Sequence, residues 1–192
     1  MFFVSRPTAD LVQHFLAGQE SAQFSYPDVG KSRDGLGPRR YVRDHNRVQI
    51  GSGIETFERA KVAIREWKMF ALPWVQLCWP GLPIRVGTNV AIVISHFGFW
   101  SLNAARIVYL LEEHGACERY GFAYGTLREH GESGEERFSV EYHAEDDSVW
   151  YDLLAFSRPN LAARLAYPFT RRLQKRFAKE SMTAMKAHVE AR

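Results

Sequence analysis

The stretch from Arg119 to Phe138 reads R-Y-G-F-A-Y-G-T-L-R-E-H-G-E-S-G-E-E-R-F and is the most informative part of the chain. Aromatic and small residues alternate from Tyr120 to Leu127, and a second alternating run follows from Glu135 to Tyr142. Alternation with a period of two is typical of β-strands, whose successive side chains point to opposite faces of a sheet. The segment between the runs is acidic and rich in glycine. The stretch therefore predicts two paired antiparallel strands joined by an acidic turn.

The same period of two predicts strands on either side of this pair. These further candidates are 41–50, 74–79, 88–97, 106–111 and 149–156. Most of them are joined by short connections that contain no helix. Short connections favour antiparallel pairing, because a parallel pair needs a long crossover.

Helical spacing is found at three places. Thr8 is a candidate N-cap for a short helix that ends at Gly18, and Ser52 and Glu55 have the spacing of a capping box. The helix after Ser52 is expected to end before Pro73. After Ser157 a long helix is predicted, with Pro168 dividing or kinking it. Its apolar stripe is Leu161, Leu165, Phe169, Leu173 and Phe177.

These elements predict an α+β helix-grip fold, in which a curved antiparallel sheet of about six or seven strands wraps around a long C-terminal helix. The chain has 192 residues, 46% of them hydrophobic, which is enough for one core and short for two. We therefore expect a single domain over residues 1–192, with residues 1–40 as an N-terminal helix and a turn-rich lead-in.

The composition argues against several kinds of protein. Cys78 and Cys117 are isolated, which predicts neither a zinc site nor a disulfide framework and fits a reduced, cytoplasmic protein. No signal-peptide core precedes Arg6, and no window has the roughly 18 apolar residues of a membrane span. Gly30-Lys31-Ser32 resembles the end of a phosphate-binding loop, but Ser25 stands where that motif needs a glycine. We expect a soluble protein without a metal or cofactor, and a surface loop at Gly30.

A longer motif carries a family resemblance. Y-G-T-L-x-x-H-x-x-x-G-E-E-x-F spans Tyr124 to Phe138, with Tyr26-x-x-Val29-Gly30 upstream and Phe156-Ser157-Arg158-Pro159 and Pro168-x-x-Arg171-x-x-Gln174 downstream. Over nearly its whole length the chain resembles the DUF1990 family of domains of unknown function, although Arg128-Glu129 replaces an expected Pro-Gly. The element order is similar to the helix-grip fold of START domains, pollen-allergen-like proteins and polyketide cyclases. That similarity implies a cavity for an apolar small molecule between sheet and helix.

The alternation also predicts which side chains line such a cavity. We expect the ligand to be bound by a largely aromatic set: Phe122, Tyr124, Thr126, Phe138, Tyr142, Trp150, Phe156 and Arg158. Glu136 shares a face with Phe138, and Asp152 shares one with Trp150 and Phe156. Each carboxyl needs a raised pKa or a partner such as Arg106, Arg158 or Arg171, and an ion pair is the preferred interpretation. The alternate residues Glu135, Arg137, Ser139 and Glu141 are predicted to face water.

His130 leaves several alternatives open. With Glu132, Glu135 and Glu136 it could form a metal site, but a metal needs at least three converging ligands and this turn does not define them. A solvated acidic hairpin is the preferred interpretation. His130 is also a candidate acid or base, because an ordinary histidine titrates near neutrality. The candidate catalytic residues are therefore Glu136, His130 and Asp152.

The C-terminal segment is basic. From Ser157 onward nine Lys/Arg stand against two Asp/Glu, whereas Glu112 to Asp152 holds twelve Asp/Glu and three Arg. We expect Arg171, Arg172, Lys175, Arg176 and Lys179 to pack against that acidic stretch. The leading hypothesis is a protein that binds a small apolar molecule. The alternatives are a cyclase or hydrolase on the same scaffold, using Glu136 or His130, and an adaptor for nucleic acid or a membrane surface, of which nucleic acid is the less expected partner.

Overall fold

The computed structural model describes residues 1–35, 37–79, 81–159 and 167–191. The strands are β1 Phe2–Phe3, β2 Val42–Ser52, β3 Val75–Cys78, β4 Asn89–Ser95, β5 Trp100–Glu113, β6 Cys117–Thr126, β7 Glu132–His143 and β8 Ser148–Pro159. The helices are α1 Ala9–Ala17, α2 Ile54–Arg65, the short 3-10 helix η1 Lys68–Phe70 and α4 Tyr167–Glu190. None of the helices in these ranges is long and apolar enough to cross a membrane.

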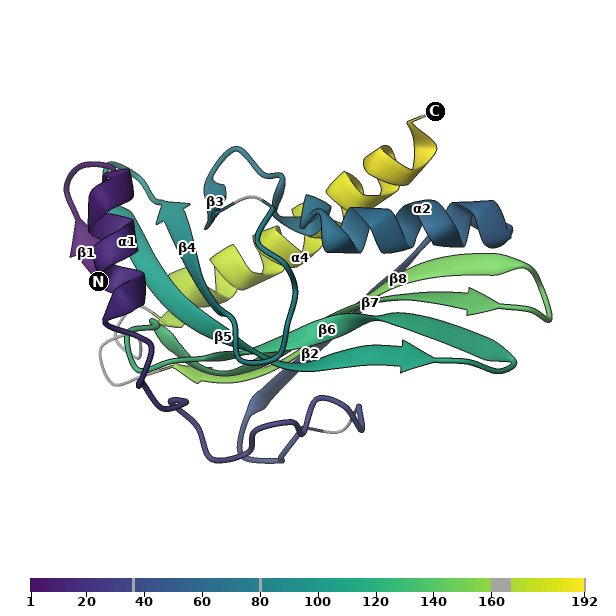
Figure 1. Cartoon of the computed structure of the whole chain (residues 1–192), viewed down its shortest axis with the longest axis horizontal. Coiled ribbons are helices and arrows are strands. Elements are labelled where there is room, and N and C mark those ends of the chain that lie inside the picture. The colour runs from purple at the N-terminus through teal and green to yellow at the C-terminus, as the bar shows by residue number, and fades with distance from the viewer. Residues whose placement is uncertain (36, 80, 160–166, 192) are drawn as a thin grey trace.

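The strands form one curved antiparallel sheet. Seven of them follow the order β2-β8-β7-β6-β5-β4-β3, and β1 pairs separately with β5. Figure 1 shows α2 and α4 together on one side of this sheet, with α4 running along it from the end that carries β1 and β4. The predicted α+β helix-grip fold is confirmed.

The main core lies between the sheet and these two helices. Phe57 and Ile64 of α2 and Met185 of α4 are buried in one cluster with Phe122 of β6 and Phe138 of β7. The Phe122 and Phe138 rings pack on each other with their centroids 5.4 Å apart. Burial of these aromatic side chains stabilises the packing of the helices on this face.

The opposite face of the sheet is covered by the N-terminal region. Val12 and Phe15 of α1 pack against Leu102 of β5 and Leu127, and the segment after α1 continues along the sheet (Figure 1). The prediction that alternate residues of β7 face water is therefore wrong, because the lead-in and two arginine side chains shield them. Glu135, Arg137 and Ser139 are buried on this face, and Glu141 is buried there beside Arg47 and Arg119.

Of the two predicted helix N-caps, one is confirmed and one is wrong. Thr8 caps α1 as predicted and accepts a hydrogen bond from Leu11 N. The capping box at Ser52 is not formed, since Gly53 is the N-cap of α2 and no side chain caps that end. Gly53 has a φ of 86°, a conformation that glycine adopts without strain.

The helix after Ser52 is shorter than predicted, and the beginning of the last predicted helix lies outside the described residues. Trp67 is in the left-handed conformation, so α2 ends at Arg65, well before Pro73. Pro168 is the second residue of the described span of α4, and the residues before it, 160–166, lie outside the described residues, so the division or kink predicted at Pro168 stays a prediction. The predicted stripe residues Leu161 and Leu165 lie outside the described residues.

Candidate functional site

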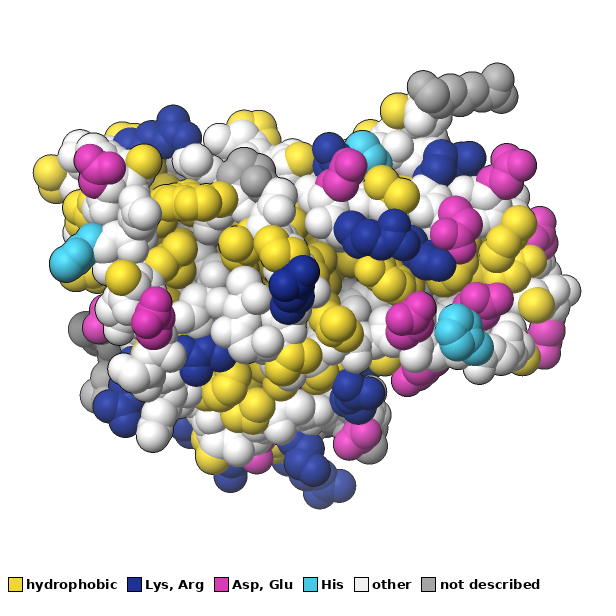
Figure 2. All heavy atoms as spheres, viewed as in Figure 1, with side chains coloured by type: hydrophobic (Ala, Val, Ile, Leu, Met, Phe, Trp, Pro, Cys, Tyr) yellow, Lys and Arg dark blue, Asp and Glu magenta, His cyan; other side chains and the backbone are white. Residues whose placement is uncertain are grey.

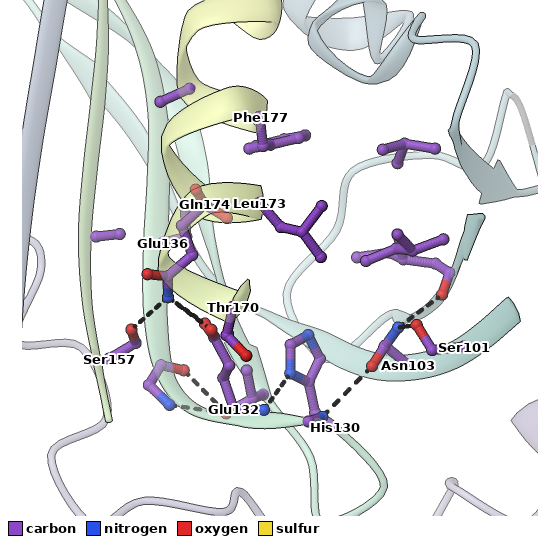
Figure 3. Close-up of a pocket in the computed structure, with 18 of the residues that line it drawn as sticks. Ser101, Asn103, His130, Glu132, Glu136, Ser157, Thr170, Leu173, Gln174 and Phe177 are labelled. Carbon is purple, nitrogen blue, oxygen red and sulfur yellow. Dashed lines mark hydrogen bonds between the residues drawn. The ribbon is translucent and has the colours of Figure 1, made fainter. Parts of the chain in front are cut away.

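A cavity of about 370 Å³ lies between α4 and the curved sheet. Its apolar wall includes Phe70, Trp74, Val75, Ile92, Ile94, Leu153, Leu173 and Phe177. Its polar wall includes Asp44, Ser101, Asn103, Tyr124, Thr126, His130, Glu132, Glu136 and Gln174. Figure 3 shows Leu173 and Phe177 projecting from α4 above the cavity, with Asn103 and His130 along its lower edge. The polar groups therefore gather at one part of a mainly apolar space.

Glu136 projects from β7 into this cavity, as its position in the alternating pattern predicts. It is paired in register with Tyr124 of β6, and the Tyr124 hydroxyl donates a 2.7 Å hydrogen bond to Glu136 Oε2. Burial raises the pKa of Glu136 to about 7; the Tyr124 hydrogen bond lowers it, and Glu132 and Asp44 raise it further. Glu136 is thus a carboxyl group that changes charge close to neutral pH.

A second carboxyl, the half-buried Glu132, lies near Glu136. Gln174 Nε2 of α4 donates to both Glu132 oxygens, at 2.6 and 2.7 Å, and to Ser157 Oγ at 3.1 Å (Figure 3). Burial raises the pKa of Glu132, whereas Gln174 and Arg171 act in the opposite direction. The amide of Gln174 therefore ties α4 to the turn at the start of β7.

Arg171 lies one helical turn before Gln174. Its Nη2 donates to Asp44 Oδ1 of β2 at 2.7 Å, and its Nη1 donates to Gln174 Oε1 at 2.6 Å. The spacing of three residues puts Arg171 and Gln174 on one face of α4. Asp44 and Gln174 were missed as site residues, although the Pro168-x-x-Arg171-x-x-Gln174 motif was a usable signal for Gln174. Glu132 was considered only as a possible metal ligand beside His130.

His130 also lines the cavity, in the turn before β7. Its Nδ1 accepts a 3.0 Å hydrogen bond from the backbone N–H of Glu132. An acceptor role for Nδ1 places the ring proton on Nε2 and requires a neutral imidazole. Burial lowers the pKa of His130 to about 4. His130 therefore holds its own turn in shape as a neutral residue.

Five predicted site residues thus line the cavity: Tyr124, Thr126, His130, Glu136 and Phe156. Phe122, Phe138 and Tyr142 lie on the same face of the sheet but belong to the packed core. The Phe122 ring is 4.7 Å from that of Trp67, and the Phe138 ring is 5.4 Å from that of Phe70. Tyr142 packs beside Phe57 and donates to Asp147 at 2.9 Å. These three residues belong to or pack against the core and are not among the residues that line the cavity.

The predicted site residues of β8 lie on the opposite face, which corrects the expectation for this strand. Tyr151, Leu153 and Ala155 face α4, so the alternate residues point toward the N-terminal segment. Trp150 packs under Arg47, and Arg158 is exposed beside Tyr41. Phe156 borders the cavity, yet its ring packs against Tyr26 and Tyr41, with centroids 5.7 and 5.0 Å away. Both faces of β8 are apolar, so its sequence does not show which face the helix covers.

Asp152 is part of an ion pair on that opposite face. It accepts a 2.9 Å hydrogen bond from Arg137 Nη2 and also contacts His45 Nε2. Arg137 in turn donates to the backbone carbonyls of Ser32 and Arg33 in the lead-in, at 3.2 and 3.3 Å. Asp152 is therefore structural and does not share a pocket with Glu136.

Glu135 organises the loop that resembles a phosphate-binding motif. Its carboxylate accepts hydrogen bonds from the Tyr26 hydroxyl at 2.6 Å, Gly30 N at 2.7 Å and Ser32 N at 2.9 Å. The backbone amides of Gly30 and Ser32 thus donate to a carboxylate of the same chain, whereas the Lys31 amide donates to Asp28 O. Gly125 permits this contact, because a Cβ there would lie 2.1 Å from the Tyr26 hydroxyl oxygen.

One cluster in the described ranges brings three possible metal ligands within 4.8 Å of one another: Cys117, Glu141 and His143. Arg47 and Arg119 donate to Glu141 at 2.6 and 3.0 Å, and Arg47 also lies 2.6 Å from His143 Nε2. Two guanidinium groups already neutralise the carboxylate and would repel a cation. This cluster is best described as an ion-pair network.

The basic face of α4 has different partners from those predicted. Arg171 pairs with Asp44, outside the acidic stretch, while Arg176 and Lys186 pair with Glu180 and Glu190 of α4 itself. On the side of the molecule seen in Figure 2, Lys and Arg side chains are interspersed with Asp and Glu. An adaptor role for this helix stays a prediction.

Comparison with known proteins places this arrangement in a family. The model of DUF1990, a domain of unknown function, matches residues 25–184. The chain belongs to the DUF1990 family. A UPF0548 protein of Dictyostelium discoideum is 33% identical to it over 204 residues, covering 96% of this chain and 94% of the relative.

Two solved structures share the fold of this DUF1990 chain. One is a hypothetical protein of Helicobacter pylori, with a TM-score of 0.53 and 12% identity over 88% of this chain and 96% of the other. The second is the di-domain ARO/CYC StfQ from the steffimycin biosynthetic pathway, with a TM-score of 0.51 and 11% identity over 78% of this chain and 51% of the other. The Gly134-Glu135-Glu136 motif of the DUF1990 chain is divided between the two faces of this fold. Glu135 binds the lead-in, and Glu136 faces the cavity.

Proposed function

We propose that the protein binds a small, largely apolar molecule in the cavity between α4 and the sheet. The observation that carries this proposal is a space of about 370 Å³ whose walls are mostly apolar and whose polar lining includes Glu136 and its partner Tyr124. Ligand sites in proteins commonly combine an apolar concavity with a few polar groups that orient the ligand. The apolar part of the ligand would lie among Trp74, Ile92 and Phe177, with its polar part toward Tyr124 and Glu136.

Filling the cavity is the direct test. Ala155 lines the space, so Ala155→Leu should reduce its volume and weaken binding of an environment-sensitive apolar dye, measured by fluorescence titration. The matched control is Ala144→Leu, at an exposed position in the turn between β7 and β8, which should leave dye binding unchanged. Equal dye affinity in the two variants would contradict the proposal. Native mass spectrometry of the purified protein would then identify a co-purifying ligand by its mass.

Catalysis in the same cavity is a second candidate function, favoured by one observation. Glu136 has a pKa of about 7 and is hydrogen-bonded to Tyr124, which is suitable for accepting and returning a proton near neutral pH. The fold similarity to StfQ is compatible with such a role, but at 11% identity it does not indicate that the two proteins share an activity. Glu136 is the candidate acid or base, and Tyr124 is the candidate orienting group.

A metabolite extract incubated with the protein would test this second function. Untargeted mass spectrometry should detect a conversion that the wild-type protein performs and Glu136→Gln does not. Glu145→Gln, an exposed position, should retain it. Conversion by Glu136→Gln at the wild-type rate would exclude Glu136 as the acid or base.

A further inference from the structure

The polar end of the cavity contains more acidic groups than basic ones. Asp44 from β2 and Glu132 and Glu136 from β7 all line it. Arg171 pairs with Asp44, which leaves the two glutamates as the excess acidic groups. Carboxylates accept hydrogen bonds and donate none when ionised, so this region presents acceptors to a ligand.

The side chains that donate to these two glutamates are neutral. Glu136 receives the hydroxyl of Tyr124 at 2.7 Å, and Glu132 receives the amide of Gln174 at 2.6 and 2.7 Å. In the described part of the chain, Glu135 also borders the cavity, with its carboxylate accepting hydrogen bonds from Tyr26, Gly30 and Ser32, and four further titratable groups lie nearby. His130 is held neutral by its turn, His96 directly follows β4 and has a pKa lowered by burial, Arg171 binds Asp44, and Lys175 is exposed at the edge.

The charge arrangement discriminates between ligand classes. A carboxylate or phosphate entering this end of the cavity would meet Glu132 and Glu136 at short range, and a low-dielectric wall strengthens that repulsion. An ammonium group would instead supply both the positive charge and the hydrogen-bond donors that the glutamates accept. A neutral hydroxyl would supply a donor without the charge.

We propose that the ligand is an apolar amine, whose protonated nitrogen binds Glu136 while its hydrocarbon part occupies the apolar wall near Trp74 and Phe177. This inference rests on the proposed ligand-binding function and adds the chemical class of the polar group. It follows from the position of two carboxyl groups with neutral donors inside an apolar cavity.

The proposal has a pH signature. An ammonium group binds the ionised form of Glu136, and the pKa of that carboxyl is about 7 in the free protein. The affinity for an amine should therefore rise about tenfold between pH 6 and pH 8, because the ionised fraction rises by about that factor. The affinity for a neutral alcohol of the same length should not follow this curve.

Three probes of equal chain length separate the possibilities: 1-octylamine, 1-octanol and octanoate, titrated by calorimetry at pH 6 and pH 8. In the wild-type protein the amine should bind most tightly at pH 8 and octanoate most weakly. Glu136→Gln keeps the shape and the acceptor for Tyr124, and should weaken amine binding by roughly tenfold to a hundredfold, as for loss of a charged hydrogen bond. Octanol binding should weaken much less than amine binding, because the octanol hydroxyl carries no charge, and Glu145→Gln should behave as wild type.

Tyr124→Phe provides a second variant that does not depend on Glu136→Gln folding. It removes a donor that competes for Glu136, so amine binding at pH 8 should be retained or become tighter. Amine and octanol affinities that are equal in the wild-type protein would overturn the amine proposal and leave ligand binding standing. Loss of amine binding in Tyr124→Phe with octanol binding intact would also overturn it. Absence of binding by all three probes would overturn both proposals.

Discussion

The Tyr124 hydroxyl donates a 2.7 Å hydrogen bond to Glu136 Oε2 across directly paired positions of β6 and β7. Side chains at paired positions point to the same face of a sheet, so this contact follows from strand register. The face in question is the one covered by α4, which puts the pair at the cavity. A carboxyl group held there has only a neutral donor beside it, and its charge state therefore responds to pH and to ligand.

The raised pKa of Glu136 predicts a stability change near neutral pH. The pKa is about 7 in the folded chain against 4.5 ordinarily, so between these values the folded state keeps a proton that the unfolded state has lost. The free energy of unfolding must then fall as pH rises from 4.5 through 7. Glu136→Gln does not titrate and should remove this pH-dependent loss of unfolding free energy, which amounts to at most about 3 kcal/mol at pH 8. Urea unfolding of both proteins at pH 5 and pH 8 measures the difference, and a difference that does not change with pH would contradict the assignment.

The lowered pKa of His130 predicts a loss of stability as pH falls, opposite in direction to the effect of Glu136. The pKa of His130 is lowered from 6.5 to about 4 in the folded chain, so the unfolded state takes up a proton first as pH falls. Stability contributed by neutral His130 is therefore lost between pH 6.5 and pH 4. His130→Asn keeps an acceptor for the Glu132 N–H but does not titrate, so its unfolding curves should depend less on pH over this range. His114→Asn, at an exposed position, controls for loss of a histidine; an equal effect of both substitutions would be evidence against the buried role.

Glu135 should stabilise the lead-in. Its carboxylate accepts hydrogen bonds from Tyr26, Gly30 and Ser32. A glutamine side chain in its place would direct its NH2 group at one of these three groups, which are themselves donors. Glu135→Gln should cost about 3 kcal/mol of unfolding free energy and speed amide exchange over residues 26–32. Hydrogen exchange with mass spectrometry measures the loop directly. Glu129→Gln is the exposed control, and unchanged exchange in Glu135→Gln would show that the loop is held by other contacts.

Two glycines of the acidic turn should respond differently to a methyl group. A Cβ at Gly134 would lie 2.0 Å from the carbonyl oxygen of Phe156, whereas at Gly131 the nearest atom, Asn103 Oδ1, is 3.8 Å away. Gly134→Ala must displace a strand backbone and should cost about 3 kcal/mol or more. Gly131→Ala should change stability by less than about 1 kcal/mol. Thermal unfolding of the pair tests this, and equal destabilisation would refute the close approach of β7 and β8.

Much of the fold was predictable because its signals are local. The alternation over Tyr120 to Leu127 and Glu135 to Tyr142 predicts paired strands, and the register that follows from it brings Tyr124 and Glu136 to one face. Thr8 capped its helix as expected, since an N-cap depends only on its own turn. The prediction of a capping box at Ser52 is wrong, because Gly53 and not Ser52 is the N-cap of α2.

The sequence by itself determined the strand pattern, the long final helix and the inward position of Glu136, because each depends on the periodicity of neighbouring residues. Only the tertiary structure decided which face of β8 meets α4, since both faces are apolar and Asp152 finds its partner Arg137 on the far side. It also decided that Asp44, Glu132 and Gln174, which belong to three different elements, meet at one end of the cavity. Contacts between distant segments depend on how the sheet curves and on which segments cover each face. Neither property can be predicted from the spacing of neighbouring residues.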